Sequence, residues 1–345
     1  MIFEKEIAEF LDVYSQEKKI MGSFQLYYKG EKFKYNFGYA DLENKIPFDD
    51  ETKFKYYSIT KGYTAIALMI LYDKGLVDLN AHPSKYLDCA KNLDKNITVY
   101  NLLTHTSGLP EITTKERYRL SVEYDKEKLV EEIASLELKF KAGTQTDYNN
   151  TNFILIGLLI EKISGERYDD FVTNNILKPL NMNNTFFFGD DYIEKFAKGY
   201  NKDDNGNLIP ADYVNIKFFG SAGGLLGTVD DLFKLYFAIK NNTILKPKTW
   251  ELVFTPSGIG DGGTHGFGNH VFDWHGKLVY QYNGGADGFR TIHRILPEED
   301  MSIIILSNCG FGGVRSDVPE FIYSLFFGEA EKSDTPIMDK GFATK

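Results

Sequence analysis

The 345-residue sequence predicts a single α+β unit, because strand patterns lie at both ends of the chain and helix patterns lie between them. The first strand-like segments lie within residues 23–37, and the last lie within residues 278–306. The part from about residue 97 to 240 is mainly helical. We therefore expect the terminal segments to share an antiparallel sheet flanked by helices, with the middle of the chain as a mainly helical insert.

The predicted domain covers residues 1–328, and residues 329–345 are expected to form a polar tail. Within the domain, the sheet part takes in about residues 1–60 and 218–328, and the helical part takes in about residues 61–217. A cleft is expected where the two parts meet, because such a seam is a favoured place for a functional site.

Composition indicates a soluble globular protein without a polyanionic partner. The net charge of −10 argues against nucleic acid, and a hydrophobic content of 43% is ample for a core. No stretch reaches the roughly 18 apolar residues of a membrane span, and the first residues lack the features of a secretory signal. We expect a cytoplasmic protein, and the sequence leaves the oligomeric state open.

Cysteine and histidine patterns argue against a bound metal. Cys89 and Cys309 are too few for a disulfide framework or a thiolate metal site, although a single disulfide stays open. The six histidines contain no His-x-x-x-His pair, so zinc is not expected. His265, His270 and His275 are five residues apart and share no face of a helix or strand, which indicates loop residues.

The N-terminal part is interpreted as a helix, a hairpin and a second helix. Residues 2–18 have an amphipathic helix pattern, and alternating apolar residues at 23–28 and 32–37 predict an antiparallel hairpin. From Ser58 to about Lys74 there is no proline and the central run is apolar on every side. This pattern predicts a helix that is buried all round, with Ser58 at its amino end.

This placement gives Ser58 and Lys61 a chemical interpretation. Residues three apart lie on one helical face, so the Lys61 amine approaches the Ser58 hydroxyl. Burial and the positive end of the helix dipole disfavour the ammonium form, so a partly neutral Lys61 is expected to accept the Ser58 proton. The alternative is a serine helix cap followed by a lysine that reaches solvent. Ser15 and Lys18 have the same spacing in a solvated helix and are interpreted as structural.

Further helices and strands follow from periodicity and from turn residues. The expected helices are Val99 to Leu103, Lys126 to Leu136, Thr151 to Ser164, Tyr168 to Ile176, Asp230 to Lys240 and Val318 to Phe327. The expected strands are Leu278 to Tyr282, Thr291 to Leu296 and Met301 to Leu306.

Tyr148 and Asn150 lie in a polar turn before an apolar helix. Held near Lys61, Tyr148 would favour the phenolate and act as a proton shuttle, while the Asn150 amide would hydrogen-bond a substrate carbonyl. The alternative is a packed tyrosine beside an asparagine helix cap.

The glycine-rich segment that begins at Tyr282 and Asn283 follows directly after a predicted strand. Gly284 and Gly285 would let backbone amides approach a ligand closely and supply an oxyanion donor. The alternative for this segment is an ordinary hairpin turn.

Taken in order, these three segments resemble the motifs of the serine β-lactamase and penicillin-binding protein superfamily. The motifs are Ser58-Ile59-Thr60-Lys61, Tyr148-Asn149-Asn150 and the glycine-rich segment at Tyr282. Flanking segments that share the resemblance are residues 102–110, 178–182 and 222–225. The sequence is most similar to the class C β-lactamase-like branch, which includes esterases and D-amino-acid peptidases, and the likeness runs from about residue 22 to 327.

The resemblance implies a β-lactamase/transpeptidase-like fold and an acyl-enzyme mechanism. Ser58 would attack the carbonyl of an ester or amide, possible examples being a β-lactam or a D-amino-acid peptide. Lys61 and Tyr148 would relay its proton, Asn150 would orient the substrate, and the Ser58 and Gly285 amides would form the oxyanion hole. It implies no cofactor, and the expected partner is a small-molecule ester, amide or peptide.

One position departs from the family pattern. Tyr282 stands where the family usually has lysine or histidine, and it brings no charge to bind a substrate carboxylate. A neutral ester or amide therefore becomes a better expected substrate, unless Arg290 turns inward and supplies the cation. The alternative function is a catalytically weak ligand-binding or sensory module that retains the fold.

Overall fold

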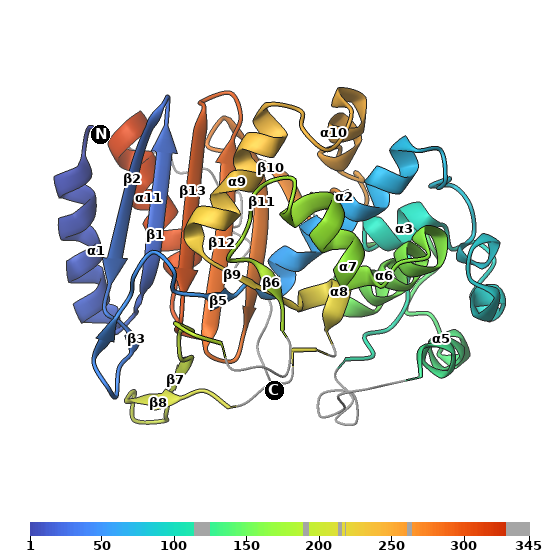
Figure 1. The fold of residues 1–345 in the computed structure, drawn as a ribbon, viewed down its shortest axis with the longest axis horizontal. Coiled ribbons are helices and arrows are strands. Elements are labelled where there is room, and N and C mark those ends of the chain that lie inside the picture. The colour runs from blue at the N-terminus through green and yellow to red at the C-terminus, as the bar shows by residue number, and fades with distance from the viewer. Residues whose placement is uncertain (114–124, 189–192, 213–215, 218, 261–263, 329–345) are drawn as a thin grey trace.

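The fold is organised around one antiparallel sheet with a group of helices beside it (Figure 1). The computed structural model describes residues 1–113, 125–188, 193–212, 216–217, 219–260 and 264–328. The predicted tail at 329–345 lies outside the described residues.

The sheet joins the two ends of the chain, as expected. Its six strands, in spatial order, are β10 (His270–Trp274), β11 (Lys277–Ala286), β12 (Phe289–Leu296), β13 (Met301–Ser307), β1 (Gly22–Tyr28) and β2 (Glu31–Phe37). Every neighbouring pair is antiparallel, and β1 pairs with β13 from Gly22 opposite Ser307 to Tyr28 opposite Met301. The predicted fold class, an antiparallel sheet built from both termini, is therefore confirmed.

Helices cover both faces of this sheet. Successive strand residues point to opposite faces, and Tyr27 packs against Phe233 of α9 (Val229–Lys240) while Tyr28 packs against Phe326 of α11 (Val314–Phe327). On the α11 face, α1 (Glu4–Lys18) lies beside α11 through the stacked rings of Phe10 and Phe321. The central strands β12, β13 and β1 are thus buried between two layers of helices.

The central helix begins in the short 3-10 helix η1 (Tyr57–Ile59) and continues as α2 (Thr60–Asp73). All residues from Thr60 to Leu71 are buried, which confirms the prediction of a helix without a solvent face. It packs against α6 (Asn150–Ser164) and α8 (Gly220–Gly223), so the N-terminus of α2 lies where the helices meet the sheet.

The remaining elements are short. The other helices are η2 (Pro83–Lys85), η3 (Asp88–Asn92), α3 (Val99–Leu103), α5 (Lys126–Ser135), α7 (Tyr168–Val172), the π-helix η4 (Thr173–Leu177) and α10 (Pro247–Val253). The other strands are β3 (Tyr39–Asp41), β4 (Ile46–Pro47), β5 (Phe54–Lys55), β6 (Phe186–Phe187), β7 (Tyr200–Lys202), β8 (Leu208–Pro210) and β9 (Leu225–Gly227).

Three of the differences from the sequence prediction concern β11, α11 and β10. The strand predicted to end at Tyr282 continues to Ala286, so the glycine-rich segment is part of β11 and not a turn. Helix α11 begins at Val314 and not at Val318 as predicted, and it accommodates Pro319, which removes only one backbone donor. Strand β10 was not predicted, and it begins at His270, which was expected in a loop.

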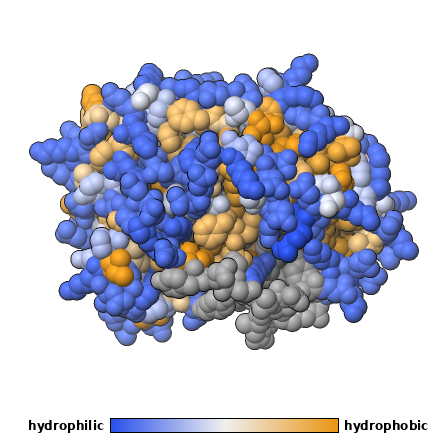
Figure 2. Space-filling model, viewed as in Figure 1, coloured by the Kyte–Doolittle hydropathy of each residue, from blue (hydrophilic) through white to orange (hydrophobic). Residues whose placement is uncertain are grey.

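Hydrophilic residues cover most of the face seen in Figure 2, with smaller hydrophobic areas between them. No helix in the described ranges is long and apolar enough to cross a bilayer. The disulfide that the sequence left open is not formed, since Cys89 and Cys309 are both free thiols.

Candidate active site

Ser58 is presented by a constrained backbone at the junction of the sheet and the helices. Strand β5 pairs with β9 and leads into η1, where Tyr57 has a φ of 48°. A left-handed φ in a residue that is not glycine costs of order 1 kcal/mol, and such strain often occurs beside functional residues. Ser58 itself is half-buried, so its hydroxyl remains within reach of a ligand.

The Lys61 side chain is buried and makes three hydrogen bonds from Nζ. The partners are Ser58 Oγ at 3.0 Å, Asn150 Oδ1 at 2.7 Å and the backbone carbonyl of Ala222 at 2.7 Å. Lys61 is only 1% exposed, and burial lowers the pKa of its amine to about 7, although the charge of Glu111 opposes this shift. A large fraction of Lys61 is therefore the neutral amine near pH 7, as the sequence predicted.

The second predicted motif meets Lys61 at the start of α6. Asn149 caps this helix through a 3.0 Å hydrogen bond from the Asn152 amide, which places Asn150 in the first turn and Tyr148 just before it. The ring centre of Tyr148 lies 4.9 Å from Lys61 Nζ. The structure therefore brings Ser58, Lys61, Tyr148 and Asn150 together.

Tyr148 differs from expectation in its protonation. Burial raises the pKa of the Tyr148 phenol, while a hydrogen bond with Ser58 and the charge of Arg315 lower it by less. The sequence predicts a phenolate at this position. A neutral phenol is instead the stable form, because burial disfavours the charge of the phenolate.

Strand β11 brings the third segment onto the nucleophile. A Cβ on Gly284 would overlap the carbonyl oxygen of Tyr56, and the Thr291 hydroxyl, opposite Gly284 on β12, donates to that same oxygen at 3.1 Å. Only glycine permits this approach of β11 to the backbone that carries Ser58. Gly285, the next residue, is consequently held close to η1.

Tyr282 and Asn283 point to opposite faces of the sheet. Tyr282 is 1% exposed and packs on Gly62, where a Cβ would overlap the Tyr282 ring. This burial leaves almost no surface for a substrate, which corrects the expectation that Tyr282 binds one. The Asn283 Oδ1 atom has no hydrogen-bond partner within the described ranges.

Replacing Tyr282 with phenylalanine is expected to raise the free energy of unfolding by about 1 kcal/mol, because its buried hydroxyl has no hydrogen-bond partner in the part of the chain that the structure describes. Urea denaturation would measure the change. Tyr200→Phe is the matched control, since the buried Tyr200 hydroxyl accepts a 2.8 Å hydrogen bond from the Leu42 amide. The control should destabilise, and equal effects of the two variants would contradict the argument.

Arg290 does not replace the cation that Tyr282 lacks. It pairs with Gly285 on the sheet face opposite Tyr282, and Nη1 donates to the carbonyls of Ala286 and Phe289 at 3.2 and 3.0 Å. Arg315, in the first turn of α11, instead acts electrostatically on Tyr148. Nothing in the sequence relates Arg315 to Tyr148, because the two residues are 167 positions apart in the chain.

Three histidines that were given no role line up beside Tyr148. His105 lies 4.5 Å from the Tyr148 ring centre, His265 lies 5.3 Å from His105, and His270 lies 4.5 Å from His265. Burial lowers the pKa of His265 to about 4 and that of His270 to about 3, and it lowers the pKa of His105 well below its usual value. This row of rings is therefore uncharged at neutral pH, and His105 Nδ1 accepts a 3.3 Å hydrogen bond from the Asn149 amide.

Residue spacing predicted no common face for His265 and His270, but they lie opposite each other across an isolated antiparallel bridge, and His105 joins them from a distant segment. No group of three or more His, Cys, Asp or Glu side chains in the described part of the chain is arranged to hold a metal ion.

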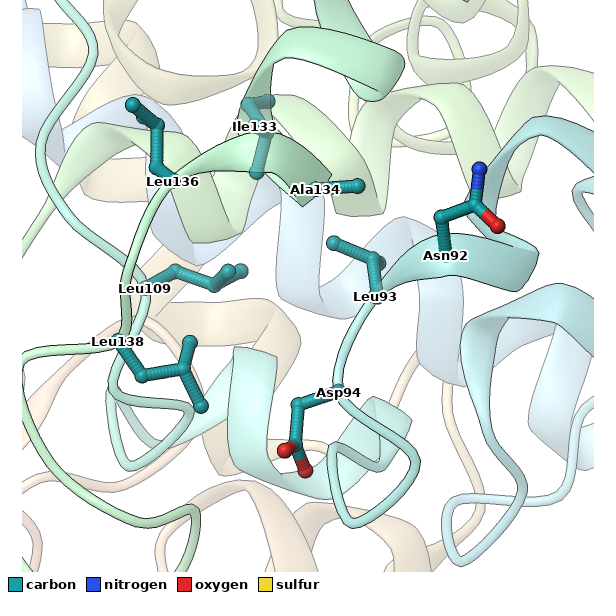
Figure 3. A pocket seen from close by; sticks show the side chains of 8 residues that line it. All are labelled: Asn92, Leu93, Asp94, Leu109, Ile133, Ala134, Leu136 and Leu138. Carbon is teal, nitrogen blue, oxygen red and sulfur yellow. The ribbon is translucent and has the colours of Figure 1, made fainter.

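A pocket of about 260 Å³ lies between η3, the segment at Leu109 and α5 (Figure 3). Its lining is mostly leucine, isoleucine and alanine, with Asn92 and Asp94 as the polar members. None of the predicted site residues lines it, and its connection to the site is indirect: the Leu109 carbonyl accepts a 2.8 Å hydrogen bond from Asn149 Nδ2.

Comparison with known proteins gives one consistent family. The sequence model of the family described as Beta-lactamase matches residues 6–322. Protein flp of Staphylococcus aureus (strain NCTC 8325 / PS 47) is 26% identical over 316 residues, which cover 88% of this chain and 63% of that protein. The chain thus spans less than two thirds of the length of the curated relatives it matches.

Solved structures agree with this family. A penicillin binding protein from Bacillus halodurans is 25% identical with a TM-score of 0.80, and the match covers 92% of this chain and 99% of that one. D-amino acid amidase from Ochrobactrum anthropi SV3 shares the fold at 24% identity with a TM-score of 0.78, over 90% of this chain and 93% of that one. The match of the family model to residues 6–322, on a fold shared with a penicillin binding protein, shows that this chain belongs to the Beta-lactamase family.

Proposed function

We propose that this protein is a serine hydrolase that forms an acyl-enzyme on Ser58 with a small ester or amide and then hydrolyses it. The observation that carries the proposal is the buried Lys61 amine, with a pKa lowered to about 7, hydrogen-bonded at 3.0 Å to the hydroxyl of a half-exposed serine. A buried lysine beside a serine hydroxyl is an activated nucleophile pair.

In the first step, neutral Lys61 accepts the proton of Ser58, and Oγ forms a bond to the substrate carbonyl carbon. The oxyanion that results is stabilised by the backbone amides of Ser58 and Gly285. The approach of Gly284 to Tyr56 supports this assignment, because it holds the two amide-bearing segments together.

In the second step, the bond from the carbonyl carbon to the leaving group breaks. The neutral Tyr148 phenol donates a proton to the leaving alcohol or amine and regains one from the Lys61 ammonium. Water then attacks the acyl-enzyme by the same steps in reverse and releases the acid.

The proposed substrate class rests on the lack of charge at Tyr282 and on the names of the similar proteins. The position that usually carries lysine or histidine in this family holds Tyr282, which favours neutral esters and amides over carboxylates. The names of the similar proteins, a penicillin binding protein and a D-amino acid amidase, make β-lactams and D-amino acid amides the first amides to test.

Intact mass after incubation with a fluorophosphonate and, separately, with a penicillin tests the proposal. We expect a fluorophosphonate adduct on the wild type that is absent from Ser58→Ala, and a panel of aryl esters and D-amino acid amides should show which acyl group turns over. Absence of any adduct would overturn the hydrolase and favour a module that binds a ligand without turnover.

The pH dependence of kcat/KM should follow the protonation of Lys61. Because Lys61 must be neutral to accept the Ser58 proton, activity should rise with pH along a limb whose apparent pKa is near 7. Initial rates with a neutral aryl ester between pH 5 and 9, after correction for spontaneous hydrolysis, would measure it. A flat profile across this range would exclude Lys61 as the base.

A further inference from the structure

A closed network of hydrogen bonds lies behind Asn150, and its outermost member is Glu111. Glu111 Oε1 accepts from the Thr113 amide at 2.8 Å and from the Thr113 hydroxyl at 2.6 Å. Its Oε2 atom accepts from the Asn150 amide at 2.7 Å. Asn150 Nδ2 in turn donates to Thr113 Oγ1 at 3.0 Å.

This network has only one consistent direction. An ionised carboxylate can only accept, so the single hydroxyl proton of Thr113 is used on Glu111. Thr113 Oγ1 is then left as an acceptor, and Asn150 must turn its NH2 group toward it. The amide oxygen of Asn150 is thereby aimed at Lys61, although the chemistry of an isolated asparagine allows either orientation.

The orientation of Asn150 decides where the Lys61 lone pair points. A neutral amine has two N–H groups, and two carbonyl oxygens that can only accept, those of Asn150 and Ala222, each lie 2.7 Å from Nζ. With both N–H groups used on these oxygens, the lone pair faces the remaining neighbour, Ser58 Oγ at 3.0 Å. That is the geometry in which Ser58 donates its proton.

We infer that Glu111, acting through Thr113 and Asn150, is the positioning residue that turns the basic lone pair of Lys61 toward Ser58. This inference rests on the proposed function. Glu111 touches neither the reacting atoms nor Ser58, and its influence passes through hydrogen bonds.

The charge of Glu111 adds a second effect that can be measured. Groups around the Lys61 amine come from η1 (Ser58), α6 (Asn150 and Phe153), α8 (Ala222) and the segment before α6 (Tyr148). Among titratable groups in the described ranges, Glu111 raises the pKa of Lys61, and His105 is itself affected by the Lys61 charge. Removing the Glu111 charge should therefore lower the pKa of Lys61.

Glu111→Gln is the main test. A carboxamide has one acceptor oxygen for the three donors that Glu111 serves, so the direction of the network is lost. We expect the plateau of kcat/KM to fall by up to about 100-fold and the acid limb to move to lower pH. If Glu111 only supported the fold, its replacement would lower the plateau of kcat/KM without moving the acid limb of the pH profile.

Glu161→Gln is the matched control. Glu161 accepts at 3.1 Å from the amide of Tyr168, the first residue of α7, much as Glu111 accepts from the first residue of α6. This control removes the same charge at a helix start away from Ser58 and should leave the pH profile unchanged.

A second pair of variants tests the hydroxyl. Thr113→Val removes the hydroxyl that accepts from Asn150 while nearly keeping the side-chain shape, and it should slow acylation. Thr113→Ser keeps the hydroxyl and should acylate at the wild-type rate. The inference is overturned if Glu111→Gln leaves the limb in place, or if the valine and serine variants acylate equally fast. Failure of the wild type to form a Ser58 adduct would instead overturn the proposed function itself.

Discussion

Alanine at position 58 is expected to lower turnover by at least about 10³-fold, because Ser58 carries the only hydroxyl among the described residues that hydrogen-bonds the Lys61 amine. Stability should change by no more than about 1 kcal/mol, since the side chain is small and Lys61 keeps its hydrogen bonds to Asn150 and Ala222. Initial rates and urea denaturation of the same preparation would measure both effects.

The chain contains its own control for this variant. Ser15 and Lys18 repeat the spacing of Ser58 and Lys61, but they lie in α1, where Ser15 Oγ donates to the Ile20 carbonyl at 2.7 Å. Ser15→Ala should keep full activity. Turnover that survives in Ser58→Ala and disappears in Ser15→Ala would mean that the wrong serine has been assigned.

Lys61→Met should also lower the rate of acylation by about 10³-fold or more, because the base that accepts the Ser58 proton is removed. Its effect on stability should depend on pH. The folded-state pKa of Lys61 is about 7 and the unfolded value is about 10.5, so between these values the unfolded chain binds more protons and wild-type stability rises with pH. The methionine variant lacks this term, so its stability relative to wild type should fall by up to about 1.4 kcal/mol per pH unit in that window.

Lys55→Met is the matched control for this second prediction. Lys55 is also buried, its amine lies about 6 Å from the ring centres of Tyr57, Phe196 and Phe289, and burial lowers its pKa to about 8. The control should show the same sign of pH dependence between about 8 and 10.5 and should retain acylation. Parallel stability curves for wild type and Lys61→Met would contradict the lowered pKa.

The sequence predicted those parts of the fold that depend on local pattern. Alternating residues located β1 and β2, strand-like segments on either side of a turn located β12 and β13, and a run that was apolar on every side identified α2 as buried. The glycine-rich segment was harder to assign to a strand from the sequence, because glycine normally weakens a strand. Gly284 is nevertheless in β11, since the Tyr56 carbonyl occupies the space that a side chain would need, and that neighbour is distant in sequence.

In the candidate site too, the sequence predicted contacts between neighbouring residues but not contacts between distant segments. Ser58 and Lys61 are one helical turn apart on a helix that is buried all round, so their contact follows from spacing together with burial, whereas Ser15 and Lys18 share only the spacing. The other partners of the Lys61 amine, Asn150 and Ala222, come from α6 and α8, and Glu111 acts from a fourth segment. No periodicity relates segments that are separated by loops, so these contacts, like the row of histidines, required the folded chain.

The burial of Lys61 by several separate segments also makes its amine a reporter of assembly. An amine with a pKa of about 7 exists only while α2, α6 and α8 stay packed together, because in the open chain the same group returns to about 10.5. During refolding from urea, a reagent that modifies neutral amines or the activated serine would therefore distinguish molecules whose helices have docked from molecules that have only formed secondary structure. The rate at which reactivity returns would give the rate of that docking step.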